Sequence, residues 1–268
     1  LVLFITTSIL FFWKKKYLFS SIFFGVALAT KWTAIYMLGY IGLVLLFSLP
    51  WKKNFKVIVS NFKQIISIGL LYLVIGAIIY VLSYSPLIIH YGWAKFVHLQ
   101  QQMYWYHTGL VATHPWQSPA LSWPILLRPV WFWVSYGQDT ISNIYALGNP
   151  LIFWGGLLAV MFTLVYSLAY KQYKLLLLLL AYVAFWMPWM LSPRIMFLYH
   201  YLPAIPFLTI ILAFTLSKLS QIRLFGQSLT LLFIGATLGV FIFFYPYWTG
   251  IPVPKNQLSQ YQWLPTWK

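Results

Sequence analysis

The sequence has almost no acidic residues and no cysteine at all. Of its 268 residues, one is acidic, Asp139, and charged residues of both signs make up 7% of the chain. A pair of catalytic carboxylates or a carboxylate cage for a metal ion therefore cannot be assembled from this chain alone. The absence of cysteine excludes a disulfide framework, a thiolate zinc site and a cysteine nucleophile.

Apolar residues take the place of the missing charges. Hydrophobic residues amount to 62% of the chain and aromatic residues to 21%, whereas about a quarter of the residues in a soluble domain are charged. A soluble globular domain is thus excluded, and so is a disordered chain, because disorder requires low hydrophobicity. The composition favours a multi-pass protein of the cell membrane.

Long apolar runs predict an all-α, polytopic membrane fold. A helix needs about 20 mostly apolar residues to cross a bilayer. Runs of sufficient length occupy residues 32–50, 64–85, 151–170, 175–192, 195–217 and 227–247. With the shorter runs 1–13 and 17–30, the fold would have about seven to eight transmembrane helices. The run 17–30 is expected to be a short, tilted or re-entrant helix.

The net charge of +16 is explained by membrane topology. If the turn Lys14–Lys16 lies in the cytoplasm, strict alternation of the predicted spans places eleven of the 17 basic residues inside and six outside. The lysine clusters then lie in short inner turns, as the positive-inside rule requires. A nucleic-acid partner is not expected, because basic nucleic-acid binders carry their charge on a soluble surface.

The same alternation divides the chain into four parts. We expect N-terminal helices in 1–85, a long outer-face loop in 86–150, a four-helix membrane region in 151–247 and an outer-face tail in 248–268. The loop and the tail contain nine of the 15 tryptophans, and tryptophan prefers the headgroup level of a bilayer. Both segments are therefore expected at the membrane surface, and a loop of this length is usually functional.

Two cations near the outer face are candidates for phosphate binding. Arg128 lies between apolar residues and is followed by Pro129, so we expect it at a turn or helix end. A guanidinium is well shaped for phosphate, whereas Lys31, between two apolar runs, would offer a point charge. Either side chain could instead reach out to lipid headgroups, and the sequence leaves that alternative open.

The segment 192–206 (SPRIMFLYHYLPAIP) is the second candidate cluster. We expect Arg194 to open a helix, with Tyr201 on the same face and His200 pointing elsewhere. The two prolines that follow should kink or interrupt this helix, which frees carbonyls that need partners. A charge at membrane depth indicates function by default, and the alternative is an interfacial anchor within an aromatic belt.

The remaining polar residues carry weaker signals. His114 precedes a proline and is either a structural hydrogen-bonding residue or a catalytic one. Asp139 is expected in a turn rather than as a general base, and Asn149 before Pro150 is expected to start a helix. The histidines are not spaced for a metal site, and no Gly-rich phosphate loop is present.

Together these segments resemble a known family. The series LATKWTAIY, YVLSYSP, QQMYWYH, THPWQSP, SWPILLRPVWF, ALGNP, RIMFLYHYLPAIPF and FYPYWTGIPV is similar to the protein O-mannosyltransferases of bacterial type. The resemblance covers about residues 17–253, and the motifs follow in the same order. The family belongs to the type C glycosyltransferases, which are polytopic and use lipid-linked sugars.

The resemblance implies transfer of mannose from a polyprenyl phosphate to a Ser or Thr hydroxyl of an exported protein. It further implies inversion at the anomeric carbon and an active site at the outer face, with the lipid-linked donor as substrate and no bound cofactor or metal. The partners implied are membrane lipid, this donor and the acceptor protein. Phosphate contacts are expected from Arg128, Arg194 and Lys31, and sugar or acceptor contacts from His114, His200 and Tyr201.

The sequence departs from the family in one respect. The family carries a catalytic Asp-Glu dipeptide in its first outer loop, and no such dipeptide occurs here. The acceptor hydroxyl needs a base to take its proton, and the leaving phosphate needs cations. Because the chain offers cations without a base, and because 1–13 begins without Met or signal-peptide features, we expect an N-terminally truncated piece that is inactive alone.

Other functions remain open at the level of the sequence. A related type C enzyme could use another lipid-linked sugar or another acceptor, such as lipid A or a glycolipid. A lipid transporter or flippase subunit should show inverted repeats with broken helices in both halves, and the proline pair in 192–206 is a partial match. A purely structural membrane subunit is a further alternative.

Overall fold

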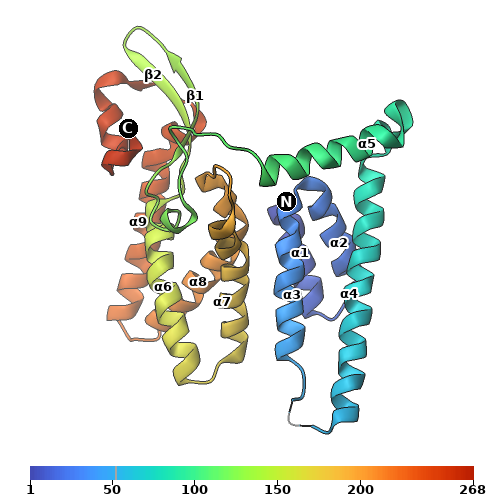
Figure 1. Cartoon of the computed structure of the whole chain (residues 1–268). Coiled ribbons are helices and arrows are strands. Elements are labelled where there is room, and N and C mark those ends of the chain that lie inside the picture. Colours follow the sequence, from blue (N-terminus) through green and yellow to red (C-terminus); the bar gives the residue numbers. More distant parts are fainter. Residues whose placement is uncertain (52) are drawn as a thin grey trace. The chain divides into compact units, whose positions relative to one another are not determined.

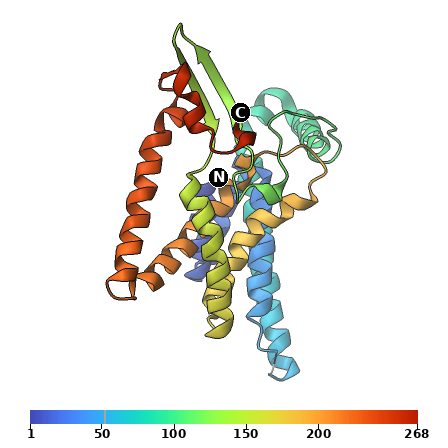
Figure 2. The same cartoon turned by 90° about the vertical axis from the view of Figure 1, so that its left-hand side faces the viewer.

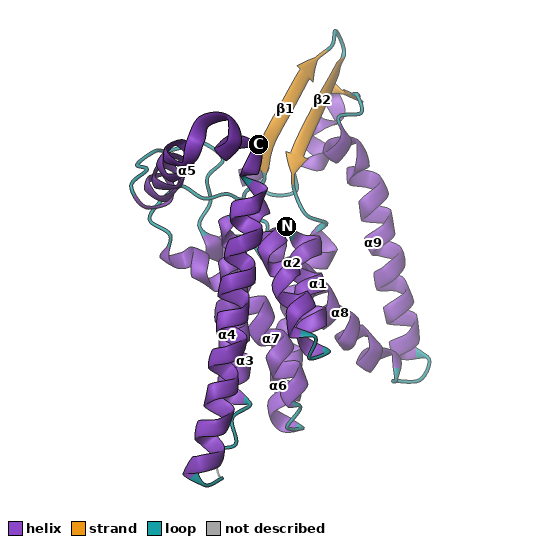
Figure 3. Ribbon diagram, turned by 90° about the vertical axis from the view of Figure 1, so that its right-hand side faces the viewer, coloured by secondary structure: helices purple, strands orange, loops and turns teal. Residues whose placement is uncertain are grey.

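A computed structural model describes residues 1–51 and 53–268 of the chain. The fold divides into two compact units, Leu1–Gly109 and Leu110–Lys268. Helices dominate both units, and the strands of the described residues lie in the second unit, as the colouring in Figure 3 shows. The mostly helical, multi-pass membrane fold predicted from the sequence is confirmed.

The first unit consists of helices connected by short turns (Figure 1). Its elements are α1 (Val2–Trp13), α2 (Tyr17–Thr30), the 3-10 helix η1 (Trp32–Ile35), α3 (Tyr36–Phe47), α4 (Phe55–Ser83) and α5 (Ser85–Thr108). The two short runs of the sequence thus form α1 and α2. The run predicted as one span over 32–50 is divided into η1 and α3.

Buried hydroxyl groups connect α1, α2 and α4. The hydroxyl of Ser8 donates to the backbone carbonyl of Ser20, and the hydroxyl of Ser20 donates to the carbonyl of Ser8, each over 2.6 Å. Tyr72 on α4 donates to the hydroxyl of Ser20. Lipid tails are as apolar as the helix surfaces, so hydrogen bonds and close packing, rather than the hydrophobic effect, associate these helices in a bilayer.

The expected loop 86–150 contains regular structure at both ends. Its first part belongs to α5, which bends where Gly92 adopts a φ of +78°, a conformation that favours glycine. Its last part contains a β-hairpin, described below. Helix α5 does not qualify as a candidate membrane span, in agreement with the absence of a predicted span in this part of the sequence.

The second unit carries four long apolar helices and a small sheet (Figure 2). Its helices are η2 (Ala120–Ser122), α6 (Pro150–Ala169), α7 (Tyr173–Trp186), η3 (Met187–Leu191), η4 (Leu198–Ala204), α8 (Ile205–Ser220), α9 (Phe225–Thr249), η5 (Lys255–Tyr261) and η6 (Pro265–Trp267). As expected, Asn149 starts α6: its side chain accepts a hydrogen bond from the backbone N–H of Leu151 over 3.0 Å.

Five helices of the described residues are long and apolar enough to cross a membrane. They comprise Phe55–Ser83 in the first unit and Pro150–Ala169, Tyr173–Leu191, Leu198–Ser220 and Phe225–Thr249 in the second. Each overlaps a span predicted from its apolar run. In the second unit, α6 ends in the turn that contains Lys171, and α8 ends in the turn that contains Arg223. Both turns lie at the helix ends away from the sheet.

A three-stranded antiparallel sheet corrects the prediction that the chain is all-α. The strands are β1 (Val130–Tyr136), β2 (Thr140–Ala146) and β3 (Val253–Pro254), in the order β1-β2-β3. The aromatic and β-branched run VWFWVSY favours a strand, and the backbone N–H of Gly137 donates to Thr140 across the hairpin turn over 3.0 Å. Asp139 lies in this turn, as expected, but the two strands on either side of it were not predicted.

Stacked aromatic rings attach the sheet to α9 and to the C-terminal tail. The ring of Tyr145 on β2 lies 4.2 Å from that of Tyr247 on α9, at an angle of 5°. Tyr247 in turn stacks on Tyr261 of η5 at 5.2 Å and 3°. Burial raises the pKa of the Tyr145 phenol above its ordinary value, so this ring stays neutral within the stack.

Two glycines allow α2 and α4 to approach closely. A Cβ atom on Gly25 would lie 2.8 Å from Cβ of Ile79, and a Cβ atom on Gly76 would lie 2.8 Å from Cε1 of Phe24. Both distances are too short for nonbonded carbon atoms. The contact between the two helices therefore depends on the absence of side chains at these two positions.

We predict that Gly25→Ala destabilises the first unit, because the new methyl group must push α4 away from α2. Overpacking of this kind costs about 1–3 kcal/mol. The matched control is Gly69→Ala on α4, where a Cβ would meet no atom within 4 Å and where alanine is the better helix former. Reversible unfolding of the chain in mixed detergent micelles measures both, and equal stability of the two variants would contradict the close-packing argument.

Candidate functional site

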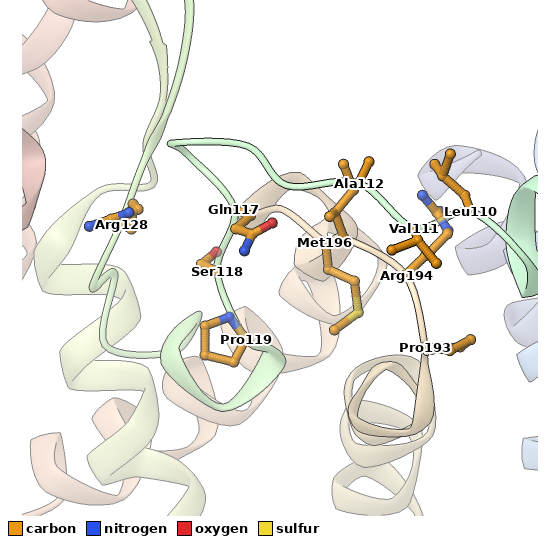
Figure 4. Close-up of a pocket in the computed structure, with 11 residues that line it drawn as sticks. Leu110, Val111, Ala112, Gln117, Ser118, Pro119, Arg128, Pro193, Arg194 and Met196 are labelled. Atoms are coloured by element: carbon orange, nitrogen blue, oxygen red, sulfur yellow. The ribbon is translucent and has the colours of Figure 1, made fainter.

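A cavity of about 500 Å³ opens in the second unit (Figure 4), and we call it the polar cavity because Gln117, Ser118 and two arginines line it among apolar residues. It lies where the connecting segment 110–119, the residues before β1 and the link between η3 and η4 meet. Its lining consists of Leu110, Val111, Ala112, Gln117, Ser118, Pro119, Arg128, Pro193, Arg194, Ile195 and Met196. Two arginines selected from the sequence, Arg128 and Arg194, are thus brought to one cavity from positions 66 residues apart in the chain.

Arg128 is held by the backbone of the connecting segment. Its Nη1 donates to the carbonyl of Pro115 over 2.6 Å, which fixes the half-buried side chain against the connecting segment. The C-terminal tail supports the residues just before it, since the indole N–H of Trp267 donates to the carbonyl of Leu126 over 2.6 Å. Arg128 therefore lies in an irregular stretch before β1, as the proline after it indicated.

Arg194 is buried, with 8% of its surface exposed. The prediction that it opens a helix is wrong, because the helix begins at Leu198 and Arg194 lies in the irregular link 192–197. Pro193 holds Ser192 in an extended conformation, at φ −71° and ψ 125°, which ends η3, and the carbonyl of Met196 in the link accepts the backbone N–H of Ser118 over 2.9 Å instead of a helical partner. In Figure 4, Arg194 and Arg128 lie on opposite sides, with Gln117, Ser118 and Met196 between them.

His200 contacts Arg194 from the protein interior. Its Nε2 lies 3.2 Å from Nη2 of Arg194, and its Nδ1 lies 3.0 Å from the carbonyl oxygen of Phe197. A guanidinium can only donate, so Nε2 accepts from Arg194, while Nδ1 also lies 3.3 Å from the backbone nitrogen of Phe197. With 2% of its surface exposed, His200 does not line the cavity itself.

Aromatic rings enclose His200. Trp123 stacks on it at 6.2 Å and 16°, and Trp189 meets it edge-on at 4.4 Å. The indole N–H of Trp123 donates to the hydroxyl of Ser118 over 3.1 Å, and the backbone N–H of Ser118 donates to Met196 over 2.9 Å. Trp123 and Ser118 were not singled out from the sequence, although both lie in motifs noted there for their aromatic and polar residues.

The other predicted site residues occupy different places. His114 is exposed, its Nδ1 accepts the backbone N–H of Trp116 over 3.1 Å, and its ring meets Phe197 edge-on at 5.2 Å. Tyr201 is buried, and its hydroxyl lies 2.5 Å from that of Tyr182. Lys31 ends α2 in the first unit in an extended conformation. The structure therefore groups Arg128 and Arg194 at the cavity, with His200 behind Arg194.

Comparison with known proteins identifies the family. The profile described as the C-terminal four TMM region of protein-O-mannosyltransferase matches residues 92–267, a range that includes the four long helices of the second unit. The chain belongs to the protein O-mannosyltransferase family. The resemblance inferred from the sequence motifs is thereby confirmed.

Curated members of the protein O-mannosyltransferase family match most of the chain. The polyprenol-phosphate-mannose–protein mannosyltransferases of Mycobacterium tuberculosis and Corynebacterium glutamicum are 21% and 23% identical over 93% of the chain. Dolichyl-phosphate-mannose–protein mannosyltransferase 1 of Saccharomyces cerevisiae is 28% identical over 65% of it, and 24% of that protein is matched. The chain spans 56% and 57% of the two bacterial relatives' length. None of these names describes a transporter or flippase, so the alternative function as a lipid transporter or flippase subunit is not favoured.

A solved member of the protein O-mannosyltransferase family has a similar fold. The structure of the S. cerevisiae protein O-mannosyltransferase Pmt1-Pmt2 complex bound to the sugar donor is similar to 65% of this chain, with a TM-score of 0.54 and 25% identity. The similarity covers 26% of the solved chain. Sequence motifs and three-dimensional structure therefore agree on the family.

We predict that His200→Ala lowers the free energy of unfolding by about 2–4 kcal/mol, because it leaves a cavity between aromatic rings and removes a buried hydrogen-bond partner. The matched control is His114→Ala, an exposed histidine whose loss should cost less than about 0.5 kcal/mol. Unfolding in mixed detergent micelles compares the two, and the site as described would be refuted by a larger effect at His114.

Proposed function

We propose that this chain binds the mannosyl phosphate headgroup of a polyprenyl-phosphate mannose donor in the polar cavity. Bound there, the donor would give its mannose to a Ser or Thr hydroxyl of an exported protein. The observation that carries the proposal is the convergence of Arg128 and Arg194 on one cavity. The names of the relatives, which describe transfer from lipid-phosphate mannose to protein, support the choice of substrate.

Two arginines at one cavity suit a phosphate that gains charge during the reaction. In the transfer, the acceptor oxygen bonds to the anomeric carbon while the bond from that carbon to the phosphate oxygen breaks. The electron pair leaves with the phosphate, and the hydroxyl proton passes to a base. Fixed guanidinium groups stabilise the leaving phosphate. The cavity lining contains no carboxylate, so the role proposed for it is donor binding and leaving-group stabilisation.

The remaining candidates have supporting roles in this proposal. His200 holds Arg194 through the contact at Nε2. His114 lies beside the ring of Phe197, which follows the cavity-lining residues 193–196, and is proposed to contact the sugar or the acceptor. Lys31 remains a proposed phosphate ligand, and Tyr201 remains a proposed contact of the sugar or the acceptor.

We predict that Arg128→Gln and Arg194→Gln each weaken binding of polyprenyl-phosphate mannose at least tenfold. A hydrogen bond to a charged group contributes about 1.5–3 kcal/mol, and about 1.4 kcal/mol corresponds to a factor of ten. Arg223→Gln is the matched control, because Arg223 is exposed in the turn between α8 and α9. The measurement is donor titration of the chain in nanodiscs. Unchanged affinity in both cavity variants would refute the proposed site.

The proposal includes an outer-face position for the cavity. We propose that the shorter apolar helices α1, α2 and the η1–α3 pair are also embedded in the membrane, beside the five long helices. The hairpin and the tail would then lie outside and the turn between α6 and α7 inside. Lys171 in that turn and Lys174 at the start of α7 support this orientation through the positive-inside rule.

The cysteine-free sequence provides a direct test of this topology. We predict that a membrane-impermeant maleimide labels Gln138→Cys in the hairpin turn of intact cells. Gln172→Cys, in the turn between α6 and α7, should react only after the membrane is permeabilised. Both positions are exposed, so their intrinsic reactivity is comparable. Labelling in the reverse pattern would place the cavity on the cytoplasmic side and contradict the proposal.

A further inference from the structure

The first strand of the sheet, β1, has a free edge. The strand order is β1-β2-β3, so among the described residues β1 pairs with β2 on one side and with no strand on the other (Figure 3). Strand β1 begins two residues after Arg128, which lines the polar cavity. The free edge therefore starts next to the site that is proposed to bind the donor.

The hydrogen-bond pattern of the hairpin shows which backbone groups line this edge. Residues of an antiparallel pair alternate between hydrogen-bonded and non-hydrogen-bonded positions. Gly137 donates to the carbonyl of Thr140 across the turn, so it occupies a hydrogen-bonded position. By the regular register of residues 133–136, Val134 and Tyr136 then occupy non-hydrogen-bonded positions. Their backbone N–H and C=O groups point away from β2 and towards the free edge.

The edge of β1 lacks most of the usual protection against strand pairing. Edge strands are commonly protected by charges, prolines or bulges, but the sequence of β1, VWFWVSY, contains no charge and no proline. A bulge interrupts the register between Trp131 and Trp133, and the pairing with β2 is regular from Trp133 onwards. Phe132, Trp133 and Tyr136 are 57%, 47% and 67% exposed. An uncharged aromatic edge of this kind is suited to bind a further strand.

We propose that the free edge of β1 binds an extended segment of the acceptor protein as a fourth, antiparallel strand of the sheet. This inference rests on the proposed function, in which a Ser or Thr hydroxyl receives mannose at the polar cavity. The outward N–H and C=O groups supply the binding, as in β-strand addition. A lipid or a sugar has no periodic row of amide groups to match this edge, so the occupant is a polypeptide.

The position of the edge sets where the modified hydroxyl lies in the acceptor. Val134 follows Arg128 by six residues. An extended residue spans at most about 3.3–3.6 Å, so Val134 lies within about 20 Å of Arg128. An acceptor segment paired with residues 133–136 thus needs only about six further extended residues to reach the polar cavity. The exposed rings of Trp133 and Tyr136 favour β-branched residues opposite them, such as Thr and Val.

The test is disulfide trapping of a peptide on the full chain in nanodiscs, which the cysteine-free sequence allows. The probe is a short Thr-Val peptide in which every second backbone nitrogen is methylated, so that only one of its edges can pair. It carries one cysteine, either at a methylated or at an unmethylated position. In the proposed pairing, Ser135 lies opposite a methylated residue and Tyr136 opposite an unmethylated one. A slip of the peptide by two residues preserves this relation.

We expect Ser135→Cys to trap the probe with the methylated cysteine at least fivefold more than the other probe. Tyr136→Cys should show the reverse preference. Both positions are exposed, so each variant is the matched control of the other, and a peptide methylated at every backbone nitrogen should be trapped by neither. Equal trapping of both probes by both variants would overturn the proposal, because side-chain contact without strand pairing shows no such alternation.

A second copy of the chain is the competing occupant. Disulfide-linked dimers of Ser135→Cys that an excess of cysteine-free peptide does not suppress would show that β1 pairs with itself, and they would overturn the proposal. Adding Val134→Pro to Ser135→Cys removes one outward N–H and leaves the hydrogen bonds to β2 in place. It should lower trapping at least fivefold, whereas Val134→Thr, which keeps the N–H, should not. Undiminished trapping with Val134→Pro would also contradict strand pairing.

Donor titration separates this inference from the proposed function. Val134→Pro should bind polyprenyl-phosphate mannose normally, since the substitution lies outside the polar cavity. If Arg128→Gln and Arg194→Gln weaken donor binding while trapping shows no alternation, the inference fails and the proposed function stands. If trapping alternates while both arginine variants bind the donor normally, the proposed function fails and the pairing of β1 with a polypeptide stands.

Discussion

The contact between Arg194 and His200 is the interaction around which the site is organised. A guanidinium with 8% of its surface exposed is costly unless its donors are satisfied. His200 accepts from it at Nε2, while Nδ1 lies against the backbone N–H and the carbonyl of Phe197. The irregular link between α7 and α8 provides that carbonyl. The break in the helix, the burial of the histidine and the orientation of Arg194 are therefore consequences of one another.

The aromatic residues replace the salt bridges that a chain with one acidic residue cannot form. Trp123 and Trp189 enclose His200, and the stack of Tyr145, Tyr247 and Tyr261 joins the sheet, α9 and the tail. Indole N–H groups also satisfy irregular backbone, as when Trp186 donates to Ala120 over 2.8 Å. Rigid rings with one polar atom suit this boundary, where one side is apolar and the other is wet.

The sequence predicted the spans better than it predicted the site. Apolar runs fix the helices because a bilayer leaves few alternatives for the backbone, so α4, α6, α7, α8 and α9 agree with their runs. The hairpin was not predicted because VWFWVSY is as apolar as a segment of a membrane helix. Only its pairing with a partner strand distinguishes a strand from a helix here. The helix expected at Arg194 begins only at Leu198, because the link before it is held by tertiary contacts such as that between Ser118 and Met196. The placement of Arg128 and Arg194 at one cavity depends on the same contacts, so neither feature could be predicted from local sequence.

The proposed donor site depends mainly on its two arginines. In a bilayer the chain of a lipid-linked sugar gains little by leaving the lipid for an apolar surface of the protein, so in this proposal the binding free energy comes mainly from charged hydrogen bonds to the phosphate. The orientation of Arg194 depends in turn on the link 192–197, because its partner His200 lies against the backbone of Phe197 and the backbone N–H of Ser118 donates to Met196. A change in that link would therefore alter the placement of a bound phosphate even where neither arginine is replaced.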